Sequence, residues 1–92
     1  MTPLIYAAHK GHKDVAELLL ANRAEVGVKD NIGMTPLHWA AFYGRRDVAE
    51  LLLANRAEVN AENNHGQTPL HAAAFQGHED VSRLLRQHGG HE

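Results

Sequence analysis

The chain of 92 residues contains no cysteine, so neither a disulfide bond nor a thiolate metal site can hold it together. It has no apolar run long enough to span a bilayer, and its first residues lack the basic start and long apolar centre of a signal peptide. The formal net charge of −2 gives no field that would hold nucleic acid or an anionic membrane. We therefore expect a soluble cytoplasmic protein without a nucleic-acid or membrane partner.

Histidine, in contrast, is present in unusual number. Protonating all eight histidines would change the formal net charge from −2 to +6. We hypothesise that solubility and partner choice change in mild acid, near pH ~6.5. A titration of binding that stays flat from neutral to mildly acidic pH would contradict this idea.

The stretch DVAELLLANRAEV occurs twice without a substitution, at residues 14–26 and 47–59. The copies start 33 residues apart, and this period divides the chain into three lines, 1–33, 34–66 and 67–92. Each line contains Thr-Pro-Leu near its start, then a pair of alanines, a glycine and Asp-Val. A fixed period of this length indicates a repeat protein, with residues 1–92 forming a single domain.

Each repeat is predicted to form a helix, a short turn, a second helix and an extended turn. Threonine can cap a helix, proline suits its first position, and the glycine can end it after about eight residues. Leu37, Ala40 and Ala41 share one face of such a helix. Helices this short are not stable alone, so each repeat must pack against the next in an all-α solenoid of helix-turn-helix units.

These residues resemble the ankyrin repeat. The period of 33 matches, as do TPLHWAA in the second repeat, TPLHAAA in the third, and GH, LLL and AEVNA around the second helix. The resemblance covers the whole chain and implies paired antiparallel helices, with β-turns projecting nearly at right angles to them. The segments LLLANRAEVNA and LLRQHGG look like bacterial or environmental members of the family.

Some positions depart from the ankyrin pattern. Ile5 stands where the motif has histidine. Arg23 and Arg56 stand where glycine usually ends the second helix, and a left-handed backbone there would cost each of them on the order of 1 kcal/mol. Asn22 or Asn55 is the alternative residue to take that conformation.

The two ends of the array differ in polarity. Ser82, Arg86 and Gln87 replace apolar residues of the earlier repeats, which we interpret as a C-terminal cap at a true chain end. No turn precedes the first repeat, so Ile5 and Tyr6 should lie near an open face. We favour a truncated or naturally short monomeric array, with weak self-association through this uncapped N-terminal face as the alternative.

All five aromatic residues are predicted to lie on one face of the first helices. Trp39, Phe42 and Tyr43 are spaced i, i+3, i+4, and Tyr6 and Phe75 are equivalent by the repeat period. The stack should align them as a stripe across three repeats. For Tyr6 and Trp39, packing between helices and partner binding both stay open. For the other three binding is favoured, because the resemblance places them on the concave surface and aromatic residues are common at hot spots.

The extended turns should project along the same surface. Ile32 and Met34 are expected to be exposed at a loop tip, with His65 and Gln67 at equivalent places. Arg45 belongs to a small basic spot beside the stripe, either solvated or paired with a partner carboxylate. The predicted partner-binding residues are Ile32, Met34, Trp39, Phe42, Tyr43, Arg45, His65, Gln67, Phe75 and Gln76.

Metal binding and catalysis have less support. His38 and His71 lie on packed helices about 8–10 Å apart, too far to share a zinc ion, and the resemblance implies local hydrogen bonds near the Thr-Pro start. His88 and His91 leave a weak histidine-based metal site as an alternative. The sequence shows no nucleophile with an adjacent base, no phosphate-binding glycine loop and no carboxylate pair in a plausible cleft. We expect no enzymatic activity and no cofactor.

The resemblance thus implies a protein–protein interaction module that binds a protein or peptide on the concave face formed by first helices and turn tips. A second interpretation is an engineered or excised scaffold without a natural partner. The uneven substitutions between repeats argue against pure consensus design.

Overall fold

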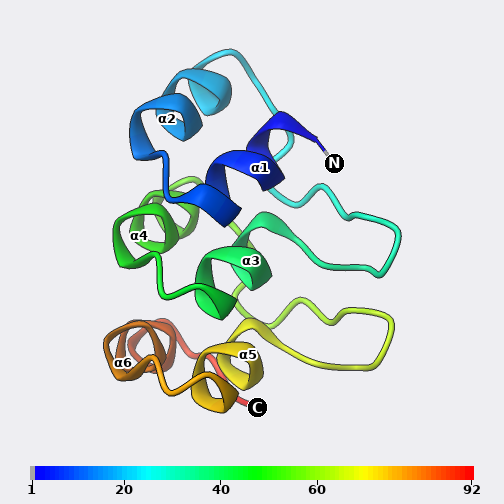
Figure 1. The fold of residues 1–92 in the computed structure, drawn as a ribbon, viewed down its shortest axis with the longest axis vertical. Coiled ribbons are helices and arrows are strands. Elements are labelled where there is room, and N and C mark those ends of the chain that lie inside the picture. The colour runs from blue at the N-terminus through cyan, green and yellow to red at the C-terminus, as the bar shows by residue number, and fades with distance from the viewer. Residues whose placement is uncertain (1) are drawn as a thin grey trace.

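Six α-helices form three pairs that stack on one another in the computed structural model, which describes residues 2–92 (Figure 1). Met1, the first residue of the first predicted repeat, lies outside the described residues. The helices are α1 (Pro3–Lys10), α2 (Lys13–Ala21), α3 (Pro36–Phe42), α4 (Arg46–Ala54), α5 (Pro69–Phe75) and α6 (Glu79–Gln87). Residues 2–92 contain no strand, so the predicted all-α class is confirmed. No helix among them is long and apolar enough to cross a membrane.

The first helix of each pair begins at a threonine. Each threonine Oγ1 accepts a hydrogen bond from the backbone N–H three residues later, and a proline follows it at the first helical position. Both features stabilise a helix start, because the hydroxyl satisfies an N–H that has no partner within the helix and proline already has a helical φ. The capping threonines are Thr2, Thr35 and Thr68.

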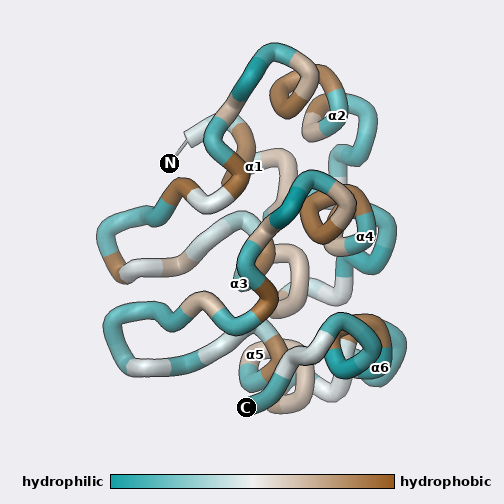
Figure 2. The backbone as a smooth tube through the Cα atoms, turned by 180° about the vertical axis from the view of Figure 1, so that it is seen from behind, coloured by the Kyte–Doolittle hydropathy of each residue, from teal (hydrophilic) through white to brown (hydrophobic). Residues whose placement is uncertain are grey.

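Alanine allows the helices to pack closely. α1 packs on α3 and α3 on α5, while α2, α4 and α6 form a second layer beside them, on the side away from the projecting loops. The alanines of the first helices that are fully buried are Ala7, Ala8, Ala40, Ala41 and Ala73. Larger residues from the second helices, such as Leu52 and Leu85, complete the core, each contributing about 1.5–3 kcal/mol by burial. Apolar residues concentrate on the helices, and the projecting loops are largely hydrophilic (Figure 2).

Two adjacent loops project from one side of the stack, between α2 and α3 and between α4 and α5 (Figure 1). The backbone N–H of Asp30 donates to Met34 O at 3.0 Å, and that of Asn63 donates to Gln67 O at 3.0 Å. The N–H of Asn64 donates to Ile32 O at 3.0 Å and joins the loops to each other. The position of each loop tip therefore depends on its neighbour.

Arg23 and Arg56 end the second helices in the left-handed conformation, each with a φ of 69°. Asn22 and Asn55 keep negative φ values, so the alternative in which asparagine takes this conformation was wrong. The side-chain amide of each asparagine instead donates to the carbonyl four residues earlier, at 2.8 Å in both helices. These bonds hold asparagine in helical register and leave the strained position to arginine.

The burial of Ser82 contradicts part of the interpretation of the C-terminal end as a polar cap. Ser82 is one of the three polar residues interpreted as a C-terminal cap, but it is buried. Its Oγ donates to His78 O at 2.9 Å, which satisfies the hydroxyl within the helix. Arg86 and Gln87 are exposed.

Replacing Arg56 by glycine should raise the free energy of unfolding by about 1 kcal/mol, because glycine has no Cβ to strain at a φ of 69°. Denaturant unfolding measures the change. Asn55→Gly is the matched control, and it should lower stability because it removes the bond to Leu51 O from a residue with ordinary φ. Equal effects of the two substitutions would contradict the assignment of strain to Arg56.

Candidate binding groove

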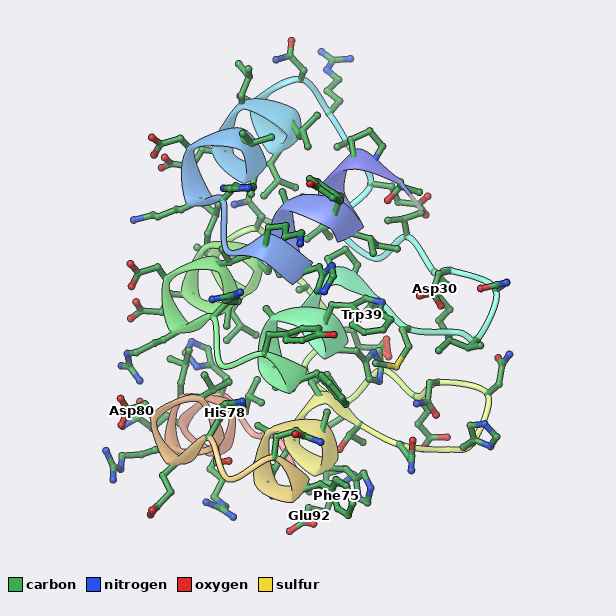
Figure 3. All side chains as sticks on the ribbon, in the orientation of Figure 1. Asp30, Trp39, Phe75, His78, Asp80 and Glu92 are labelled. Carbon is green, nitrogen blue, oxygen red and sulfur yellow. The ribbon has the colours of Figure 1, made fainter. Side chains whose placement is uncertain are left out.

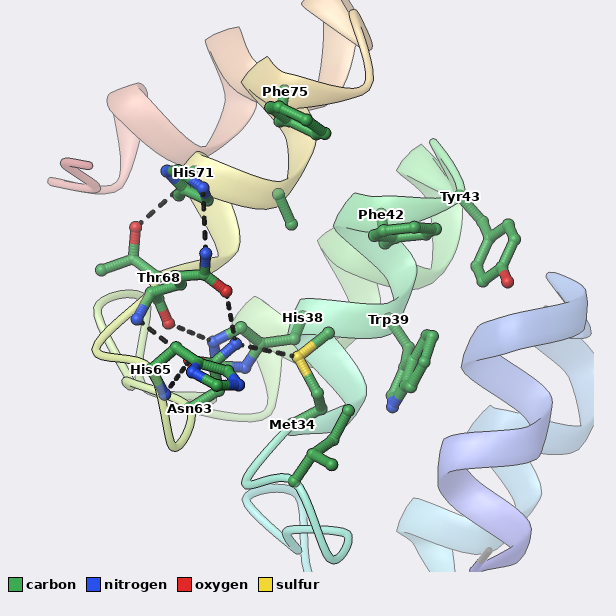
Figure 4. A pocket seen from close by; sticks show the side chains of 13 residues that line it. Met34, His38, Trp39, Phe42, Tyr43, Asn63, His65, Thr68, His71 and Phe75 are labelled. Atoms are coloured by element: carbon green, nitrogen blue, oxygen red, sulfur yellow. Dashed lines mark hydrogen bonds between the residues drawn. The ribbon is translucent and has the colours of Figure 1, made fainter.

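A groove of about 450 Å³ lies between α3, α5 and the two loops (Figure 4). Among the predicted residues, the helices provide Trp39, Phe42, Tyr43 and Phe75 as lining, and the loops provide Ile32, Met34, His65 and Gln67. Residues far apart in the sequence therefore meet at one concave site.

The groove is open because the third repeat has a small side chain, Ala72, at the position equivalent to Trp39. Trp39 and Ala72 occupy equivalent positions, 33 residues apart. Between α1 and α3 the rings of Trp39 and Tyr43 pack against His9, with centroid distances of 5.9 and 4.4 Å. Between α3 and α5 the same position holds only the methyl group of Ala72, and the space beside Phe42 stays open.

Trp39 and Phe42 of α3, with Tyr43 directly after the helix, form one wall of the groove. The centroid distances are 5.9 Å for Trp39–Phe42, 6.0 Å for Trp39–Tyr43 and 4.9 Å for Phe42–Tyr43. Phe75 is 79% exposed on the opposite wall, and its ring stacks on His71 at 6.2 Å. Mutual packing fixes the α3 rings, whereas Phe75 leaves most of its apolar surface to water.

Tyr6 does not extend this wall. It is exposed, its ring centroid lies 6.4 Å from that of His12, and Lys10 Nζ lies 6.0 Å from its centroid. It does not line the groove. The stripe predicted across three repeats is therefore interrupted at its first member.

Asp30 fixes the orientation of Trp39 (Figure 3). The indole Nε1–H donates to Asp30 Oδ2 at 2.8 Å. The other carboxylate oxygen, Oδ1, accepts from the N–H groups of Ile32 and Met34 at 3.0 and 2.9 Å. One carboxylate thus joins the first loop to the aromatic wall. This role was not predicted from the sequence, although Asp30 and Trp39 both stand at positions that differ between the first two repeats.

Met34 is buried, and its predicted exposure at a loop tip was wrong. Its Sδ accepts a hydrogen bond from Asn63 Nδ2 at 3.3 Å, because the second loop packs on the first. Ile32 is exposed, in agreement with the prediction. Met34 therefore contributes to the base of the groove, with Ile32 at its edge.

Two predicted residues, Arg45 and Gln76, do not line the groove. Arg45 Nε donates to His9 O at 3.3 Å, and its side chain lies against Gly11, so it connects the second repeat to the first. Gln76 is exposed at the C-terminus of α5. The groove also includes residues that were not predicted, namely His38, Asn63, Thr68, His71 and Ala72.

His38 connects α3 to the second loop. Its Nδ1 accepts from Thr35 N–H at 3.1 Å, and its Nε2–H donates to Gln67 O at 2.8 Å. These bonds confirm the local hydrogen bonding that the resemblance implied for His38. They require a neutral ring, because a proton on Nδ1 would oppose the N–H of Thr35. Burial lowers the pKa of His38 more than the bond to Gln67 raises it.

His71, at the equivalent position in the third repeat, makes a different contact. Its Nε2 lies 3.3 Å from Gln67 Nε2, and its backbone N–H donates to Thr68 Oγ1. Within residues 2–92, no three His, Cys, Asp or Glu side chains are grouped so that they could hold a metal ion.

Because burial lowers the pKa of His38 below the ordinary 6.5, the unfolded chain binds a proton at His38 more readily than the folded chain does. The free energy of unfolding should therefore fall as the pH drops below about 6.5, and His38→Gln should reduce this dependence. Urea unfolding between pH 7.5 and 5 would measure it. His71→Gln leaves His38 in place and should retain the pH dependence of the free energy of unfolding. If this control variant also lost the pH dependence, the assignment to His38 would be contradicted.

Two family models match this chain. The model described as "Ankyrin repeats (3 copies)" matches residues 1–63, and the model described as "Ankyrin repeats (many copies)" matches residues 43–86. No curated protein matches the chain. Ankyrin repeats are generally protein–protein interaction modules. With its period of 33, its capped first helices and its stacked helix pairs, the chain belongs to the ankyrin-repeat family.

Proposed function

We propose that this protein binds a peptide or an extended protein segment in the groove between α3 and α5. The observation that carries the proposal is Phe75, 79% exposed across an open space from the aromatic wall of α3. A partner side chain placed between Phe75 and Phe42 would remove both rings from water. Buried aromatic contacts of this kind dominate the free energy of many interfaces.

The chemistry of the groove indicates the inserted side chain. Within residues 2–92, no Asp, Glu, Lys or Arg lines it, so a charge placed there would lose water without gaining an opposite charge. An aliphatic or aromatic side chain fits this surface. On the loop side, the amide of Asn63 is already bonded to Met34, His65 and Gln67. The exposed His65 offers a polar group for the backbone of the partner.

Phe75→Ala tests the role of the exposed ring. Peptides selected from a random displayed library on the unmodified protein provide the probe, and Trp39, the single tryptophan, reports occupancy by fluorescence. The substitution should weaken binding by at least about thirtyfold, about 2 kcal/mol. It should change the free energy of unfolding by less than about 0.5 kcal/mol, because Phe75 is exposed.

Tyr6→Ala is the control, since Tyr6 is an exposed aromatic residue on a first helix outside the groove. It should leave peptide affinity unchanged. If Tyr6→Ala weakened binding as much as Phe75→Ala, or if neither did, the groove would not be the binding site.

Ala72→Trp should close the groove. The equivalent position holds Trp39 in the second repeat, so the backbone accepts an indole there. The variant should fold with little loss of stability and should fail to bind the selected peptides, as measured by isothermal titration calorimetry. Ala72→Ser, of nearly unchanged volume, is its control and should bind normally. Full binding by a folded Ala72→Trp variant would argue against occupation of this space.

A further inference from the structure

His71 and His38 stand at equivalent positions of the third and second repeats, but their rings have different surroundings. His38 is buried, and both of its ring nitrogens bond to protein groups, Nδ1 with Thr35 and Nε2 with Gln67 O. His71 is half-buried and lines the groove. Within residues 2–92, its only ring nitrogen with a hydrogen-bond partner is Nε2, which lies 3.3 Å from the side-chain nitrogen of Gln67.

A chain of amide groups decides which nitrogen of His71 carries the proton. It begins at Asn63, whose Oδ1 accepts from the backbone N–H groups of His65 and Gln67 at 2.8 and 3.1 Å. A backbone N–H can only donate, so the atom of Asn63 that faces these groups is the oxygen. The amide nitrogen of Asn63 then donates to Gln67 Oε1 at 3.0 Å. The other end of the Gln67 amide, Nε2, is therefore a donor directed at His71.

The Nε2 atom of His71 must accept this hydrogen bond, so its neutral ring carries the proton on Nδ1. His38 has the opposite tautomer, because its Nε2–H donates to Gln67 O. Gln67 thus presents a carbonyl oxygen to one histidine and an amide N–H to the other. Two histidines at equivalent repeat positions differ in tautomer for this reason.

The Nδ1–H group of His71 is open to a partner. The equivalent nitrogen of the second repeat bonds to Thr35, whereas the hydroxyl of Thr68 donates to His91 O at 2.6 Å. No buried side-chain nitrogen or oxygen in residues 2–92 lacks a partner, so this Nδ1–H is not buried. The ring stacks on Phe75 with 10° between the two planes, which holds the donor beside the exposed apolar surface of the groove (Figure 4).

We propose that His71 Nδ1–H donates a hydrogen bond to a backbone carbonyl oxygen of the bound segment, next to the side chain inserted between Phe42 and Phe75. This inference rests on the function proposed above and names a specificity-determining residue for it. A carboxylate is a poor acceptor here, because within residues 2–92 no Lys or Arg lines the groove. The segment binds in an extended conformation, since a helix uses its carbonyl groups internally.

Nitrogen-15 NMR of the imidazole rings at about pH 7.5 tests the tautomers without any partner. Ring nitrogens with and without a proton have different chemical shifts. The proton of His71 should be on Nδ1, and that of His38 on Nε2. A proton on Nε2 of His71 would overturn the proposal, whatever the groove binds.

Two amide substitutions separate the donor from the contact with Gln67. Both remove the ring and its stacking on Phe75. In His71→Asn the amide nitrogen is as many bonds from Cβ as Nδ1 is, so a donor stays in place and the bond to Gln67 is lost. In His71→Gln the amide group instead reaches the place of Nε2, so the bond to Gln67 stays and the donor is lost. Circular dichroism checks that both variants are folded.

The probes are peptides selected on the unmodified protein whose binding falls in Phe75→Ala. Isothermal titration calorimetry should show an affinity about tenfold lower in His71→Gln, the effect of one hydrogen bond, and less than about threefold lower in His71→Asn. Equal losses, or a larger loss in His71→Asn, would show that His71 only holds Gln67 in place. Such a result overturns this inference and leaves the proposed function intact.

A second series of peptides identifies the acceptor. Each polar side chain of a selected peptide is replaced in turn by alanine, and the difference in affinity between the two His71 variants should persist throughout. If one replacement abolished that difference, the acceptor would be that side chain and not the backbone. If no selected peptide depended on Phe75, the proposed function would fail, and this inference with it.

Discussion

Each helix pair of this protein is stable only because it packs against the next. The helices are 7 to 9 residues long, too short to be stable as isolated helices in water. Buried alanines on α1, α3 and α5 let neighbouring pairs approach closely, and the same threonine–proline start orients each pair in the same way. This packing fixes where equivalent side chains of successive repeats lie.

The groove follows from that fixed spacing. With the backbones of α3 and α5 held in place, the side chain at one equivalent position decides whether the space between neighbouring first helices is filled. Trp39, with Tyr43, packs against His9 on one side of α3, while Ala72 leaves the other side open. The repeated helix pairs form a rigid frame, and the presence of Ala72 at the position equivalent to Trp39 leaves the concave surface open.

Polar side chains hold the loops against this frame. Asp30 binds the indole of Trp39 and two backbone N–H groups of its own loop. His38 joins α3 to the second loop through Gln67 O. Buried polar groups contribute this kind of order only when every donor and acceptor is paired, and no buried side-chain nitrogen or oxygen in residues 2–92 lacks a partner. The walls of the groove are therefore positioned before any partner arrives.

The sequence by itself determined the period, the helix starts, the buried alanine face and most of the residues that line the groove, because these depend on spacing within one repeat. The burial of Met34, the attachment of Arg45 to the first repeat and the bond from Asp30 to Trp39 were decided only by the tertiary structure. Each of these contacts joins a loop or a turn to another element, at a distance that no local pattern encodes. Val15 gives the clearest case, because the same residue type at the same repeat position is buried or exposed according to whether another helix pair covers it.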